Sequence, residues 1–206
     1  MSDHHAGLFV FAAPSGAGKT TLVNALVTKH PDLRFSISYT TRPQRSNEAD
    51  GVDYRFIDEE AFSHLLEQNA LLESATVFDN LYGTSREQVE QHLREKHDVI
   101  LEIDWQGARQ VRESMPECVT IFILPPSLGE LERRLRDRGT DSVDVIDRRL
   151  QDAISDISHW DEFDYVVVND DLDRAIDGLE AILEGRGQSL ATDDATLRAT
   201  IAAIVS

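Results

Sequence analysis

The sequence contains a single cysteine, few basic residues and no long hydrophobic run. Cys118 lies in an apolar stretch and has no second cysteine to pair with, so an internal disulfide is excluded and a buried free thiol is expected. No hydrophobic run reaches the length of a membrane span, and the first residues lack the basic and apolar pattern of a secretory signal. These absences predict a cytoplasmic protein.

The charge balance is strongly acidic. The chain has 38 acidic and 20 basic residues in 206, which gives a formal net charge of −18. A general nucleic-acid binder needs a basic surface, and an anionic membrane repels an acidic chain, so we expect neither as a partner. An anionic substrate must then be held by local groups of arginine. The composition leaves the oligomeric state open, with a homo-oligomer among the alternatives.

One glycine-rich stretch near the N-terminus is Ala13-Pro14-Ser15-Gly16-Ala17-Gly18-Lys19-Thr20. It follows an apolar run and precedes a helical pattern, which is the context of a phosphate-binding P-loop. Backbone N–H groups of such a turn converge on one anion, and the helix dipole favours negative charge there. We expect Lys19 to reach the outer phosphates of a nucleoside triphosphate and Thr20 to ligate Mg²⁺. Ala13 replaces the usual first glycine, which is harmless unless the backbone there needs a positive φ.

Beyond this loop, apolar strands and amphipathic helices alternate, which predicts an α/β fold with a parallel core sheet flanked by helices. The core elements are expected at about 8–12, 19–30, 99–103, 105–114, 119–124, 127–139, 144–158, 165–168 and 171–184. The section from 36 to 84 is more polar and has shorter strands, so we interpret it as an inserted small mixed α/β lobe. It and its flanks are predicted to form strands at 35–39, 54–56 and 71–78, helices at 59–69 and 85–97, and a turn at 80–84.

The pattern changes after Glu184. Residues 186–206 are interpreted as a linker and a C-terminal helical tail. Leu197, Ile201 and Ile204 have the spacing of one helical face, so we expect the tail to pack on its own domain.

Arginines form two groups in this acidic chain. Arg42 and Arg45 share the inserted lobe with Tyr54 and Tyr82, and guanidinium forks together with phenolic hydroxyls suit a phosphate-bearing substrate. The second group is Arg133, Arg134, Arg136, Arg138, Arg148 and Arg149. It occupies two helices at about 126–158, which we interpret as a helical lid over the triphosphate. We expect Arg138 and Arg149 to be the functional pair and others to pair with acidic residues on the same helices.

Taken together, these motifs resemble the guanylate kinase family, whose members transfer a phosphoryl group from ATP to GMP in purine nucleotide metabolism. The resemblance covers about residues 8–184, and the corresponding domain is expected at 7–185. Besides the P-loop it rests on Ser38-Tyr39-Thr40-Thr41-Arg42-Pro43-Gln44-Arg45, Gly51-Val52-Asp53-Tyr54, Tyr82-Gly83-Thr84, Leu101-Glu102-Ile103-Asp104-Trp105-Gln106-Gly107 and Arg138-Gly139-Thr140-Asp141. The fold it implies is that of the P-loop nucleoside monophosphate kinases.

The resemblance also implies a role for each matching side chain. The GMP phosphate would be held by Arg42, Arg45, Tyr54 and Tyr82, and the guanine by Ser38, Glu73, Thr84 and Asp104. Arg138 and Arg149 would close on the phosphates of ATP, with Asn169 near the adenine. The catalytic residues would be Lys19, Arg42, Arg138 and Arg149, with ATP and Mg²⁺ as cofactors.

The chemistry of guanine agrees with this assignment. Its N1–H and exocyclic amine are adjacent donors to which one carboxylate can accept, and closure of the lobe would bring Glu73 and Asp104 to one ring. Asp104 has an alternative role, which is to bond Lys19 or a Mg²⁺-bound water, and both roles stay open. Thr84 stands where serine is common and keeps the hydroxyl.

Three alternative functions are compatible with parts of the pattern. A related kinase acts on a ribose bisphosphate but should lack the base-binding set Ser38, Glu73 and Thr84. Guanylate-kinase-like scaffold modules bind phosphopeptides without catalysis and characteristically lose the P-loop lysine, whereas Lys19 is present here. A regulatory GTPase would need an Asn-Lys-x-Asp motif, which this sequence does not contain.

Overall fold

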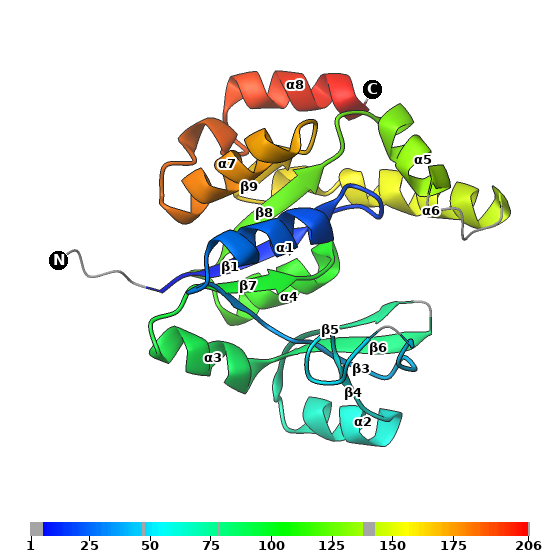
Figure 1. The fold of residues 1–206 in the computed structure, drawn as a ribbon, viewed down its shortest axis with the longest axis vertical. Helices are drawn as coiled ribbons and strands as arrows, with labels where there is room; N and C mark the ends of the chain where they lie inside the picture. The colour runs from blue at the N-terminus through cyan, green and yellow to red at the C-terminus, as the bar shows by residue number, and fades with distance from the viewer. Residues whose placement is uncertain (1–5, 47, 78, 138–142, 206) are drawn as a thin grey trace. The chain divides into compact units, whose positions relative to one another are not determined.

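A computed structural model describes residues 6–46, 48–77, 79–137 and 143–205 (Figure 1). Arg138 and the rest of the predicted Arg-Gly-Thr-Asp motif lie outside the described residues. The chain forms two compact units. The first unit is Met1–Phe9, Asp32–Leu101 and Gln106–Cys118, and the second is Val10–Pro31, Glu102–Trp105 and Val119–Ser206.

A five-stranded sheet forms the core, in the order β2-β7-β1-β8-β9. Its strands are β1 (Leu8–Ala12), β2 (Arg34–Phe35), β7 (Val99–Glu102), β8 (Val119–Leu124) and β9 (Tyr165–Val168). The β2–β7 and β8–β9 pairs are parallel, which confirms the predicted parallel sheet. Residues 121–124 of β8 are fully buried, as expected of a strand covered on both faces.

The second unit contains α1 (Lys19–Lys29), α5 (Leu128–Asp137), α6 (Val143–Ile157), α7 (Leu172–Leu183) and α8 (Ala195–Val205), with the short 3₁₀ turns η1 (Trp160–Glu162) and η2 (Gln188–Leu190). Within it, α1 packs against α7 and α5 against α6. The helix starts follow from capping residues, because an oxygen before the first turn satisfies a free backbone N–H. The Ser127 hydroxyl accepts from the N–H of Glu130, and the Asp171 carboxylate accepts from that of Arg174.

The first unit contains α2 (Glu59–Glu67), α3 (Arg86–Arg94) and most of α4 (Trp105–Ser114). Its sheet has the order β4-β3-β6-β5, formed by β3 (Tyr39–Thr40), β4 (Arg55–Phe56), β5 (Leu71–Val77) and β6 (Asn80–Ser85). The Phe62 side chain of α2 is fully buried and lies against Gly83 of β6.

Two sequence predictions in this region are wrong. The single strand expected at 35–39 is divided, since Phe35 ends β2 in the core sheet and Tyr39 begins β3 in the second sheet. The turn expected at 80–84 is strand β6, which pairs antiparallel with both β5 and β3. Pairing on both sides stabilises β6 despite its polar composition, because strand preference depends on neighbours more than on residue type.

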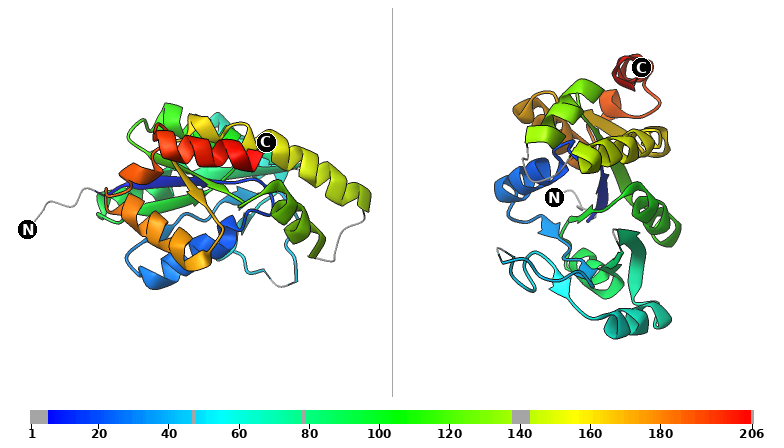
Figure 2. Two further views of the ribbon diagram at one scale, coloured as in Figure 1. Left: turned by 90° about the horizontal axis from the view of Figure 1, so that it is seen from above. Right: turned by 90° about the vertical axis from the view of Figure 1, so that its right-hand side faces the viewer.

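The C-terminal tail packs on its own unit, as predicted. Leu197 and Ile201 of α8 are buried, and the Arg198 guanidinium lies 5.0 Å from the centre of the Trp160 ring. Before α8, Ala191 forms an antiparallel bridge with Tyr165 of β9. In Figure 1 and the right-hand view of Figure 2, α8 lies at the outer edge of this unit.

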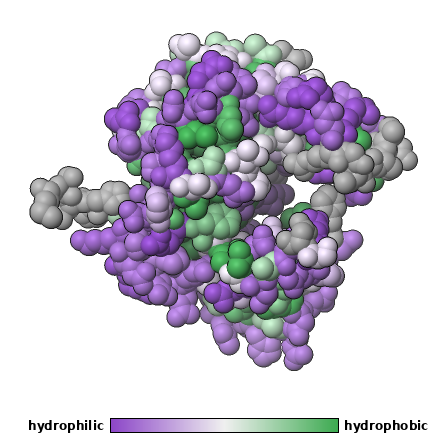
Figure 3. Space-filling model, viewed as in Figure 1, coloured by the Kyte–Doolittle hydropathy of each residue, from purple (hydrophilic) through white to green (hydrophobic). Residues whose placement is uncertain are grey.

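The face of the molecule shown in Figure 3 is largely hydrophilic, with the hydrophobic residues in smaller groups. Cys118 is a buried free thiol, which confirms that prediction. In the described part of the chain, every helix is too short or too polar to cross a membrane.

Candidate active site

The P-loop has the backbone geometry of an anion-binding turn. Gly16 and Gly18 both have a φ of 93°, a conformation that side chains with a Cβ avoid. Ala13 is not among the positive-φ residues of the described chain, so its replacement of glycine costs nothing there. The N–H of Ala17 donates to the carbonyl of Pro14 at 3.2 Å, which closes the turn. Successive N–H groups of the loop can therefore converge on a phosphate, as the sequence predicts.

Lys19 and Thr20 begin α1 and are held by the residues at the end of β7. The Lys19 ammonium donates to the carbonyl of Ile103 at 2.7 Å. The Thr20 hydroxyl donates to the Glu102 carboxylate at 2.5 Å. Glu102 was not expected at the site from the sequence. Asp104 follows directly in the connection to α4, and its predicted roles toward guanine, Lys19 or Mg²⁺ stay predictions.

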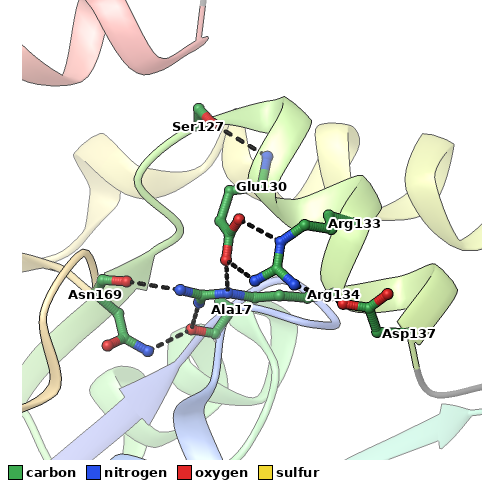
Figure 4. Close-up of polar contacts among 7 residues, drawn as sticks. All are labelled: Ala17, Ser127, Glu130, Arg133, Arg134, Asp137 and Asn169. Atoms are coloured by element: carbon green, nitrogen blue, oxygen red, sulfur yellow. Dashed lines mark hydrogen bonds and ion pairs between the residues drawn. The ribbon is translucent and has the colours of Figure 1, made fainter.

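The Asn169 side chain bonds the backbone of the P-loop (Figure 4). It follows β9, is 7% exposed, and its Nδ2 donates to the carbonyl of Ala17 at 2.8 Å. A Cβ on Gly18 would lie 2.4 Å from this nitrogen, so packing as well as backbone conformation requires glycine at position 18. The structure thus places Asn169 against the P-loop, and its role beside adenine stays a prediction.

The arginines of α5 and α6 divide into two classes. Arg133 and Arg136 pair with acidic residues of α5, as expected for a solvated helix surface. Arg149 of α6 donates from Nη2 to the Ser15 hydroxyl at 2.8 Å, so this member of the predicted functional pair lies at the P-loop. Arg134 also reaches the P-loop, through the carbonyl of Ala17.

Arg134 was not selected from the sequence, although helical periodicity carries a signal for it. At 100° per residue, Arg134 lies about 60° around the helix from Leu131, whereas Arg133 lies about 160° from it. Leu131 and Leu135 are the buried residues of α5. A residue at the edge of the buried face can reach a neighbouring element, and a residue opposite that face points to solvent.

The predicted phosphate-binding group of the lobe comes together around Arg42. Its guanidinium lies 5.4 Å from the centre of the Tyr54 ring, and the Tyr54 and Tyr82 rings meet edge to face at 5.9 Å. The Arg45 side chain is 70% exposed. These residues belong to the first unit, and they fit a cationic, hydroxyl-bearing site for an anion.

Glu48 completes this group and was missed in the sequence. Its carboxylate accepts from Arg42 Nη2 at 2.8 Å and from the backbone N–H of Arg45 at 2.9 Å. The side chains of Arg42 and Glu48 are only 13% and 11% exposed. The bond to Arg42 lowers the pKa of Glu48, and the bond to Glu48 raises the pKa of Arg42. Three residues separate Glu48 from Arg45, but that spacing alone does not distinguish it from other acidic residues of the loop.

The predicted base-binding residues of the lobe lie on adjacent strands. Glu73 of β5 pairs in register with Thr84 of β6, and the Thr84 hydroxyl donates to Glu73 Oε1 at 2.7 Å. Glu73 is 4% exposed, which excludes a solvated surface charge. Tyr82 and Thr84 are two residues apart on one strand and face the same side of the sheet. Ser38 lies in the connection between β2 and β3, where its carbonyl accepts from the N–H of Arg55.

Oxygen ligands for a cation are present next to the P-loop. Among the residues that the structure describes, no group of three His, Cys, Asp or Glu side chains is arranged as a metal site. The Thr20 hydroxyl and the Glu102 carboxylate nevertheless meet at the start of α1. Such hard oxygens suit Mg²⁺, which commonly takes one or two protein ligands and completes its shell with water and substrate phosphates.

Comparisons with known proteins agree with this geometry. The guanylate kinase family model matches residues 6–186. The chain is 53% identical over 194 residues to a guanylate kinase of Alkalilimnicola ehrlichii, covering 94% of this chain and 96% of that protein. It is 55% identical over 194 residues to a guanylate kinase of Alcanivorax borkumensis, covering 94% of each. The crystal structure of guanylate kinase from Anaplasma phagocytophilum superposes with a TM-score of 0.74 at 34% identity, covering 91% of this chain and 89% of that one. The chain therefore belongs to the guanylate kinase family.

Proposed function

We propose that this chain transfers the γ-phosphoryl group of ATP to GMP, giving ADP and GDP. The observation that carries the proposal is the combination, in one chain, of a P-loop with a second sheet that holds Tyr82 and the buried pair Glu73 and Thr84, and with Arg42 in the loop that follows β3 of this sheet. Tyr82 and Thr84 share a face of β6, so one ligand with a phosphate at one end and a base at the other can contact both. Membership of the guanylate kinase family supports this substrate.

In the proposed complex, the phosphate of GMP is held by Arg42, Arg45, Tyr54 and Tyr82. The guanidinium groups neutralise the charge of the phosphate, and the guanidinium and hydroxyl donors together fix its orientation. Glu73 accepts from guanine N1–H and the exocyclic amine, while the hydrogen bond from the Thr84 hydroxyl orients the Glu73 carboxylate. Ser38 and Asp104 complete the contacts to the base.

The triphosphate of ATP binds on the P-loop, residues 13–20. Backbone N–H groups and the N-terminus of α1 hold its phosphates, and Lys19 contacts the outer ones. Thr20 and Glu102 would hold Mg²⁺, which neutralises phosphate charge when bound. Asn169 would lie near the adenine. The predicted lid, about residues 126–158, would bring Arg138 and Arg149 to the phosphates.

The reaction needs little covalent chemistry from the protein. An oxygen of the GMP phosphate attacks the γ-phosphorus of ATP, and the bond to the bridging oxygen of ADP breaks on the opposite side. Lys19, Arg42, Arg138 and Arg149 neutralise the charge that spreads over the transferring group. Because ATP is the donor, we also propose a cytoplasmic location, which fractionation of the source cells would test.

The test is the release of ADP from MgATP with GMP, AMP, dTMP and ribose 1,5-bisphosphate offered separately. We expect GMP to be the preferred acceptor by at least two orders of magnitude. Faster ADP release with ribose 1,5-bisphosphate would instead identify a sugar-phosphate kinase, and no acceptor-dependent release from the folded protein would leave a binding module. Folding is checked by thermal unfolding of the same sample.

A further inference from the structure

Arg134 of α5 connects three separate parts of the second unit (Figure 4). Its Nε donates to Glu130 on the same helix at 2.8 Å. Nη1 donates to the carbonyl of Ala17 in the P-loop at 3.2 Å, and Nη2 donates to the carbonyl of Asn169 after β9 at 3.1 Å. Since the guanidinium is planar and its donors are fixed in direction, these bonds hold the two carbonyls at a set separation.

The carbonyl of Ala17 belongs to the peptide that joins Ala17 to Gly18. In a trans peptide the C=O and the following N–H point in opposite directions. The Ala17 carbonyl accepts from both Arg134 and Asn169, so it is fixed on the side of α5 and β9. The N–H of Gly18 is consequently fixed toward the opposite side, away from α5 and β9, in a loop in which Gly16 and Gly18 both have positive φ.

Arg133 is the natural comparison, since it is adjacent on α5 and shares the partner Glu130. Its guanidinium donates to Glu130 and Asp137, and its side chain is 61% exposed. In Figure 4 the side chain of Arg134 extends toward Ala17 and Asn169, whereas that of Arg133 turns to its own helix. Both arginines bond Glu130, but only Arg134 of the two also bonds the P-loop and the carbonyl of Asn169.

We propose that Arg134 is a positioning residue for the triphosphate of ATP, acting through the Ala17 carbonyl to orient the Gly18 N–H. This inference rests on the proposed function only in taking ATP as the P-loop ligand. Arg134 is assigned no contact with the reacting atoms. The bond from its Nε to Glu130 fixes the position of the guanidinium relative to α5.

The experiment compares Arg134→Met, Arg134→Lys and the matched control Arg133→Met. The kinetic measurements are kcat and the KM values for ATP and GMP, and the binding measurement is calorimetric titration with inorganic tripolyphosphate, which has no base or ribose. For Arg134→Met we expect KM for ATP and Kd for tripolyphosphate each to rise about tenfold, with KM for GMP within twofold of wild type. Arg134→Lys should recover part of the loss, since an ammonium group can reach one of the two carbonyls. Arg133→Met should leave all these values unchanged.

Three results would overturn the inference. If KM for ATP rises but tripolyphosphate binding does not, Arg134 contacts the nucleoside and not the loop. If ATP and GMP constants change equally, or if Arg133→Met has the same effect, the role is general stability of α5. Should Arg134→Met not fold, the lysine variant decides by the same measurements. Failure of the proposed function would appear differently, as absence of GMP-dependent ADP release in wild type, while tripolyphosphate binding would still report on Arg134.

Discussion

Replacing Glu73 by glutamine keeps the shape of a side chain that is 4% exposed but removes its charge. The bond from Thr84 fixes the outcome of this change. The Thr84 hydroxyl donates to Glu73 Oε1 at 2.7 Å, and the same bond in the variant would select the amide oxygen for that position. The amide nitrogen would then occupy the other position and direct its hydrogens at the donors of guanine.

The expected loss has two parts. A charge-assisted hydrogen bond contributes roughly 1.5–3 kcal/mol, and a buried donor that faces another donor adds a desolvation penalty of about 1–3 kcal/mol. Allowing for partial relaxation, the transition state with GMP should lose about 2–4 kcal/mol, which corresponds to a roughly 30-fold to 900-fold fall in kcat/KM. Discrimination against AMP should shrink, because adenine has an acceptor at N1 where guanine has a donor.

The assay measures kcat/KM for GMP and AMP, together with KM for ATP, in wild type and Glu73→Gln. KM for ATP should hardly change, since Glu73 belongs to the GMP half of the proposed site. Glu67→Gln, at an exposed position on α2, is the matched control. If kcat/KM for GMP in Glu73→Gln stays within a factor of three of the wild-type value, other residues recognise guanine and the reasoning fails.

Three further changes test other parts of the site. Lys19→Met should lower kcat by on the order of 10² or more in a folded protein, because the lost charge acts mainly in the transition state, and near wild-type turnover would refute phosphoryl transfer on this loop. Glu48→Ala should raise KM for GMP several-fold with KM for ATP unchanged, since Arg42 loses its orienting partner; a fall in KM for GMP would mean that Glu48 competes with the phosphate. Arg133 and Arg134 lower the pKa of Glu130 from 4.5 to about 2, so this carboxylate stabilises the fold above pH 4.5 and the stabilisation is lost as the pH falls from 4.5 toward 2. Thermal unfolding of wild type and Glu130→Gln should therefore converge across that interval, and a constant difference would contradict the assignment.

The parts of the fold that the sequence predicts well are those fixed by local rules. Ser127 and Asp171 precede helices because their oxygens can cap a free N–H, and the structure has both bonds. The strand at 80–85 escaped prediction because its stability comes from pairing with β5 and β3, which no local pattern encodes. The backbone turn of the P-loop could be predicted because its residues are contiguous, whereas its contacts with phosphate and Mg²⁺ stay predictions.

The residues of the candidate site that were missed are of two kinds. Some bond a partner that is distant in the sequence, and others look like ordinary residues of their type until their bond is seen. Arg134 bonds the carbonyl of Ala17, which is 117 residues away. Because every residue has a backbone carbonyl, residue types alone do not indicate this partner. Glu102 looks like an ordinary strand-end acid until its bond with Thr20 is seen. Glu73 and Asp104 belong to different units, so the prediction that both contact the base stays a prediction.

Glu48 shows how an acidic residue can belong to the proposed phosphate site. A guanidinium has five N–H donors, and the bonds from Arg42 to Glu48, to the carbonyl of Pro43 and to Tyr82 use three of them. Bidentate binding of a phosphate needs two more donors, so Arg42 can bind the phosphate while it keeps its bond to Glu48. The carboxylate also accepts from the backbone N–H of Arg45, a bond that a departing Glu48 would lose. Both bonds favour a Glu48 that stays in place and orients Arg42 while GMP binds, and this is why removal of Glu48 should weaken GMP binding even though it removes a negative charge.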